Sequence, residues 1–172
     1  GREDGVAGLG WSTGTWSTGT WSTARSAALL AVRTTSAANF GENLLFVNRF
    51  YGLHKWSLST SAKAARVTTA PSSIVSMFVS PERHVFLLGT DMDAAGVTST
   101  LNPMRVLFSD QGDETTYITT ATNLAGDVVL SEGNTLVAGK STRLVNLIWT
   151  DTALYTARHI GDIDFVFEFQ LA

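Results

Sequence analysis

The sequence predicts an all-β fold of short antiparallel strands, arranged as β-propeller-like blades of which this chain holds only part of a ring. β-branched and aromatic residues fill one short segment after another. Asp, Gly, Asn and Ser, the residues of tight turns, fill the gaps between these segments. The final segment, 164–172, carries phenylalanine at every second position, at Phe165, Phe167 and Phe169. This period-two alternation is the clearest strand signal in the chain.

The first 23 residues differ in composition from the rest and predict an extended segment. They contain the repeat GWSTGTWSTGTWST, in which regularly spaced glycines disfavour a helix. In an extended chain the spacing places Trp11 and Trp21 on one face and Trp16 on the other. This two-faced arrangement favours packing between two surfaces, and stacking on sugars or bases stays open as an alternative. The chain therefore divides into a Gly/Trp-repeat segment, 1–23, and an all-β domain, 24–172.

The order of strands follows from the spacing of turn residues. Residues 24–38 fit a short helix and a strand equally well, because short apolar runs do not separate the two. From Asn39 onward strand follows strand, and short connections predict hairpins. The expected hairpins are 43–49 with 52–59, 72–80 with 83–91, 104–110 with 115–121, and 144–151 with 153–161. The other expected strands are 127–133, 134–142 and 164–172.

A faint repeat runs through these strands and suggests propeller blades. Three blocks each pair an apolar strand with a polar turn and then a strand that carries an aromatic residue. At about 40–45 residues a blade, the chain holds roughly three blades. Three blades do not close a propeller. Either the chain is a fragment, or other chains complete the sheet edges.

Composition limits the classes of partner. Charged residues are only 16% of the chain, against about 25% in an ordinary soluble domain, so we expect a partner to cover much of the surface. The net charge of −3, without a Lys/Arg cluster, disfavours tight phosphate-neutralising binding of nucleic acid. No apolar run approaches the roughly 20 residues that span a bilayer, so no membrane span is expected. The chain begins GREDG, without a signal-peptide pattern or an initiating Met, which suggests a processed product or a piece of a longer polypeptide.

No residue pattern predicts a catalytic, cofactor-binding or metal site. His54, His84 and His159 lie in separate expected strand segments, without a carboxylate at ligand-like spacing. The carboxylates at 91–96 and 110–114 fit turn chemistry better than a calcium-binding EF-hand loop. The chain has no cysteine and no G-x-S-x-G sequence, and its GKST run lacks the first glycine of a phosphate loop. We therefore expect a protein that is not an enzyme.

Residues 102–161 resemble a block found in the tail nozzle and packaged-DNA stabilisation proteins of tailed bacteriophages. The closing segment, WTDTALYTARHIG, matches that block best, and the glycine–tryptophan repeat ahead of FGENLLF is similar to the family's lead-in. The matching positions are Trp149, Thr150, Asp151, Ala153, Leu154, Tyr155 and Gly161, with Asn123, Ala125 and Gly126 upstream. The departures are Phe40, Phe108 and Tyr117, each in place of Trp, and Gly112 and Glu114 in the turn.

The resemblance implies a structural subunit of the virion tail that forms a homo-oligomeric ring, a hexamer in that family. Such a ring contacts the portal or adaptor and other tail proteins. Its lumen retains and conducts double-stranded genomic DNA without sequence specificity, and neutral or slightly acidic walls let a duplex slide. Under this interpretation Trp11, Trp16, Trp21, Trp149 and Tyr155 are packing and interaction residues.

Two other classes of function stay open. A carbohydrate-binding β module of a host-adsorption structure would use the tryptophan repeat as a sugar platform. It would need exposed indoles on one face. A hydrolytic enzyme on a propeller or sandwich would need a catalytic constellation, which the sequence lacks.

Overall fold

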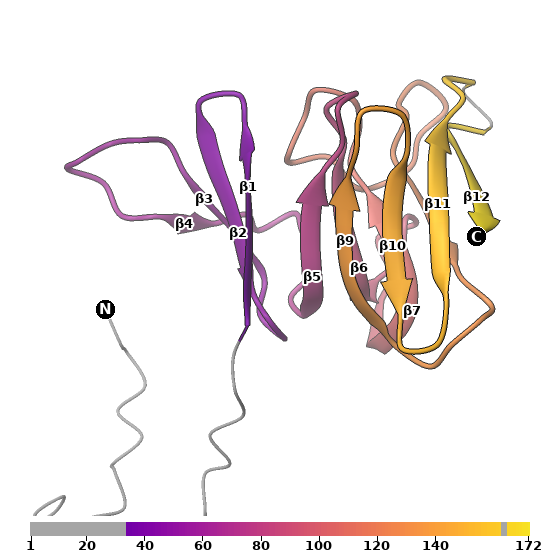
Figure 1. Ribbon diagram of the computed structural model, residues 1–172. Helices are drawn as coiled ribbons and strands as arrows, with labels where there is room; N and C mark the ends of the chain where they lie inside the picture. The colour runs from indigo at the N-terminus through magenta and orange to yellow at the C-terminus, as the bar shows by residue number, and fades with distance from the viewer. Residues whose placement is uncertain (1–33, 163–164) are drawn as a thin grey trace, which may run out of the picture. The chain divides into compact units, whose positions relative to one another are not determined.

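Three four-stranded antiparallel sheets make up the part of the chain that the computed structural model describes, residues 34–162 and 165–172. These residues belong to one compact unit, Arg33–Ala172. Each sheet takes four consecutive strands in chain order, and no helix occurs among the described residues (Figure 1). The predicted all-β class is confirmed, and the four-strand meander is that of a propeller blade. The Gly/Trp segment and its predicted boundary lie outside the described residues.

The strands follow one another at short intervals. Sheet 1 contains β1 (Thr35–Phe40), β2 (Asn43–Asn48), β3 (Leu53–Trp56) and β4 (Ala65–Arg66). Sheet 2 contains β5 (Ile74–Val79), β6 (Val85–Met92), β7 (Thr98–Phe108) and β8 (Gly126–Val129). Sheet 3 contains β9 (Leu136–Ser141), β10 (Asn146–Thr150), β11 (Leu154–His159) and β12 (Phe167–Leu171).

Sheet 2 is buried on both of its faces. Every residue of β6 is buried, and successive side chains point to opposite sides. Val85 and Leu87 pack in one cluster with sheet 1, while Phe86 and Leu88 pack in a second cluster with sheet 3. The run VFLL is continuously apolar for this reason. Each of these buried side chains contributes roughly 1.5–3 kcal/mol of transfer free energy, so the two clusters hold the three sheets together.

The first strands of the three sheets lie closest to one another. β1, β5 and β9 run in the same direction, with β5 between the other two, and the later strands of neighbouring sheets approach each other less closely (Figure 1). The Ser36 hydroxyl of β1 accepts a hydrogen bond from the Met77 amide of β5 at 2.9 Å. This wedge-like arrangement is consistent with neighbouring propeller blades, and no closed propeller is present in the described part of the chain.

One expected hairpin is wrong and the other three are confirmed. β2–β3, β5–β6 and β10–β11 pair as predicted, but segment 115–121 forms a loop. The Asp113 carboxylate accepts hydrogen bonds from the amide and hydroxyl of Thr115, at 2.7 and 2.6 Å, and from the Thr116 hydroxyl at 2.8 Å. Such local bonds compete with strand pairing, and β8 pairs with β7 instead. In the ambiguous segment 24–38, residues 35–38 belong to β1.

The contact between sheets 2 and 3 leaves no room at Gly139. A Cβ atom there would lie 2.3 Å from Cε1 of Phe78. Phe78 is 4% exposed, and its ring stacks on that of Phe86 with centroids 4.7 Å apart. We predict that Gly139→Ala lowers the free energy of unfolding by about 1–3 kcal/mol, measured by urea denaturation. Phe78→Leu in the Gly139→Ala background should recover part of the loss. Unchanged stability in Gly139→Ala would contradict this packing.

Candidate functional site

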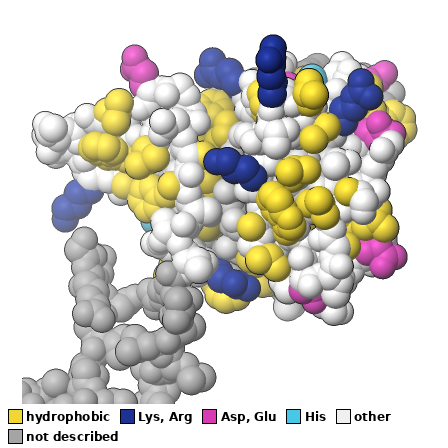
Figure 2. Space-filling model, viewed as in Figure 1, with side chains coloured by type: hydrophobic (Ala, Val, Ile, Leu, Met, Phe, Trp, Pro, Cys, Tyr) yellow, Lys and Arg dark blue, Asp and Glu magenta, His cyan; other side chains and the backbone are white. Residues whose placement is uncertain are grey.

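The outer face of sheet 3, which points away from sheet 2, carries exposed apolar side chains. On this face Trp149 of β10 pairs with Leu154 of β11, and Leu147 lies two residues before it. Trp149 is 37% exposed, and Leu147 and Leu154 are half-buried. Figure 2 shows hydrophobic side chains gathered over β9 to β11. We call Leu147, Trp149 and Leu154 the sheet 3 patch.

The outer face of sheet 1 is also apolar. Cross-strand pairing places Leu44 beside Trp56 and Phe46 beside His54, all half-buried. The rings of Phe46 and His54 stack with centroids 5.3 Å apart. The Trp56 indole N–H donates to the carbonyl oxygen of Ser59 at 3.0 Å. The described stack therefore ends on each side in a partly apolar face, on which strand register also places Lys140 and Arg66.

The predicted interaction residues lie in different environments. Trp149 is on the outer face, whereas Tyr155 is buried on the opposite face of sheet 3, where its hydroxyl accepts a hydrogen bond from the Glu132 amide at 2.9 Å. Trp11, Trp16 and Trp21 lie outside the described residues. The structure thus separates Trp149 and Tyr155 onto two faces.

Sequence reasoning missed Leu147 and Leu154 as neighbours of Trp149. The signal that could have found them is the run LIW at 147–149, which is apolar at both parities of the strand. A strand with one solvent-exposed face normally alternates apolar and polar residues, whereas a continuous apolar run indicates that both faces are buried.

A groove lies where the first strands of the sheets meet. It has a volume of about 630 Å³ and is lined by residues of β1, β5 and β9 together with Thr34, Arg49, Ser80 and Pro81. Two of its lining residues are cationic, Arg49 and Lys140, and none is acidic. Sequence reasoning did not single out this groove, because its residues come from three separate strands.

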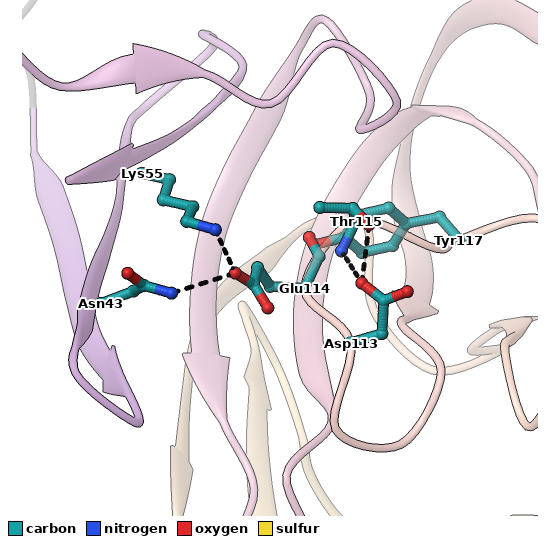
Figure 3. A network of polar contacts seen from close by, with 6 residues as sticks. All are labelled: Asn43, Lys55, Asp113, Glu114, Thr115 and Tyr117. Atoms are coloured by element: carbon teal, nitrogen blue, oxygen red, sulfur yellow. Dashed lines mark hydrogen bonds and ion pairs between the residues drawn. The ribbon is translucent and has the colours of Figure 1, made fainter. Parts of the chain in front are cut away.

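A polar network joins sheet 1 to the loop that follows β7 (Figure 3). The Glu114 carboxylate accepts hydrogen bonds from Lys55 Nζ at 2.6 Å and from Asn43 Nδ2 at 3.1 Å. The carbonyl oxygen of Glu114 accepts one from the Tyr117 hydroxyl at 3.0 Å. Burial raises the pKa of Tyr117 well above its usual value, and the neighbouring Glu114 and Asp113 charges add to the effect. The phenol therefore stays protonated and can donate.

We predict that the Lys55–Glu114 pair is energetically coupled. The Glu114 side chain is 12% exposed and that of Lys55 33%, so solvent screens the pair only in part. A double-mutant cycle with Glu114→Gln and Lys55→Met should give a coupling energy of about 1 kcal/mol, measured by urea unfolding. A coupling energy of zero would mean that the pair contributes nothing to the attachment of the loop.

A buried histidine lies between sheets 2 and 3. His84 is fully buried, and its Nδ1–H donates to the Ser109 carbonyl oxygen at 2.8 Å. Its ring lies 5.7 Å from that of His159, and neither Nε2 atom has a hydrogen-bond partner in the described part of the chain. Burial lowers the pKa of His84, and the charge of His159 lowers it further. The hydrogen bond to Ser109 and the nearby Asp110 and Glu82 raise the pKa but do not cancel the decrease. His84 is therefore held as the neutral imidazole.

The lowered pKa predicts a loss of stability in acid. The unfolded chain takes up a proton on this side chain near the ordinary histidine pKa of about 6.5, and the folded chain takes it up only at lower pH. Stability should therefore fall as pH falls through this window. His84→Phe should flatten the plot of unfolding free energy against pH between 7 and 5, whereas Leu88→Ala should lower the curve without flattening it. An equal slope in His84→Phe and the wild type would disprove the assignment.

Within the described residues, no three His, Asp or Glu side chains are grouped as a metal site requires. The same residues include no helix long and apolar enough to cross a bilayer. No protein-family model and no curated protein matches the sequence. The features that remain are the two apolar outer faces and the groove.

Proposed function

We propose that this protein is a structural subunit of a phage virion, part of a tail nozzle or portal-proximal connector ring that retains and conducts genomic DNA. The observation that carries the proposal is the stack of three sheets with an apolar outer face at each end. A self-sufficient domain would cover these faces with polar side chains. A subunit covers them with its neighbours.

The two outer faces lie at opposite ends of the stack and are formed by different residues, which favours a ring. One belongs to the last sheet of the stack and the other to the first, so copies that continue the stack associate head to tail. Head-to-tail contacts close into rings when the rotation allows it. Propellers close with about four to eight blades, so three blades in one chain need further blades from neighbours. The hexameric ring, the portal or adaptor partner and the DNA in the lumen rest on the resemblance and belong to this proposal.

The runner-up function is a carbohydrate-binding β module. The observation that favours it is the exposed indole of Trp149 on a sheet face, since an exposed aromatic ring offers an apolar surface for a sugar ring. Quenching of tryptophan fluorescence by glycans, lost in Trp149→Ala, would support this function. If glycans quench the remaining tryptophan fluorescence of Trp149→Ala as they quench that of the wild type, Trp149 is not the sugar-binding platform.

We predict that removing the sheet 3 patch disrupts assembly. The wild-type chain should have a mass well above the 18.4 kDa of one chain in light scattering at micromolar concentration. Leu147→Ser combined with Trp149→Ser should shift it to one chain with an unchanged circular dichroism spectrum. Ile118→Ser, which removes an apolar side chain that is 49% exposed outside the patch, serves as the control. A wild-type monomer, or an assembly that the double substitution leaves intact, would refute the proposal.

A further inference from the structure

The groove between β1, β5 and β9 is lined by apolar and polar residues in similar numbers, and none of its polar residues is acidic. Its side chains include hydroxyl groups from all three strands and the Asn39 amide, with Arg49 and Lys140 as the cations. The hydroxyl-bearing residues are Thr34, Thr35, Ser36, Ser76, Ser80 and Ser141. Its volume of about 630 Å³ lies in the range typical of small-molecule sites. The two cations and the absence of acidic residues suit an anion rather than a cation.

The two cations lie at opposite ends of the groove. The Arg49 amide donates to the Thr34 carbonyl oxygen at 2.9 Å, so Arg49 lies beside the start of β1. Lys140 is the penultimate residue of β9. Because β1 and β9 run in the same direction (Figure 1), the start of one and the end of the other lie toward opposite ends of the groove.

Neither cation is neutralised in the described part of the chain. The ion pairs there are Lys55–Glu114 and Arg105–Asp127. The Nε atom of Arg49 is buried and makes no hydrogen bond within the described residues, and its guanidinium lies over the Phe50 ring at 5.0 Å. A buried charged donor without an acceptor is costly and uncommon. The buried Nε atom is closed to solvent, so an oxyanion in the groove would pair with the charge of the guanidinium group as a whole.

We propose that the groove is a binding site for an elongated ligand that carries oxyanions at both ends, one held by Arg49 and the other by Lys140. Phosphate, sulfate and carboxylate groups share the required chemistry. The Ser76 hydroxyl of β5 donates to the middle of the ligand. The groove borders the sheet 3 patch, because Lys140 pairs across the strands with Leu147. The titration measures ligand binding and not assembly, so this inference and the proposed role in assembly can fail separately.

The test is a calorimetric titration of the full chain at low salt with a linear polyphosphate long enough to span the groove. Inorganic phosphate is the single-anion comparison, and it should bind at least tenfold more weakly. Arg49→Gln and Lys140→Gln should each weaken polyphosphate binding about tenfold or more, as expected for loss of a charge-assisted hydrogen bond. Lys63→Gln, which removes an exposed charge outside the groove, should leave the affinity unchanged.

Titrations with three further ligands identify which chemical class carries the natural oxyanions. An acidic peptide, a sulfated oligosaccharide and a single-stranded oligonucleotide carry the three chemistries, and the natural class is the one whose binding depends on both cations. Absence of polyphosphate binding would overturn the proposal. So would equal affinity for phosphate and polyphosphate, or an equal loss in Lys63→Gln and the two groove variants.

Discussion

The burial of sheet 2 on both faces is the constraint on which the rest of the structure depends. Its second strand sends alternate side chains into two separate apolar clusters, one shared with sheet 1 and the other with sheet 3. A shift of one residue in the pairing of that strand would exchange the two sets, so packing on both sides fixes the register. The close approach of Gly139 to Phe78 and the neutral state of His84 follow from the same tight contact.

The same constraint leaves the stack open at its ends. Sheets 1 and 3 each bury one face against sheet 2 and present a partly apolar face to their surroundings. Repetition of one packing arrangement has no natural end unless a ring closes or a polar face caps it. Neither outer face is such a polar cap, because one carries Leu147, Trp149 and Leu154 and the other carries Phe46 and Trp56. The proposed role in assembly accounts for these apolar side chains.

The period-two pattern and the turn residues were enough to predict the fold class, three of the hairpins and the number of sheets. They were not enough at 115–121, because Thr115, Thr116 and Tyr117 have strand-like composition but bond to Asp113 and Glu114 instead. Trp149 could be singled out from its side chain alone. The groove could not, since Arg49 and Lys140 line one groove only because separate sheets pack together, which local sequence pattern does not encode.

Hydrogen–deuterium exchange of the intact protein tests the central claim most directly. If the burial of sheet 2 on both faces holds the structure together, amides of β6 should exchange only through global unfolding and be the slowest in the chain. Amides of β2 and β10 should exchange sooner. The claim would be contradicted if β6 exchanged as fast as the short strand β4, or if sheet 1 or sheet 3 stayed protected after sheet 2 had exchanged.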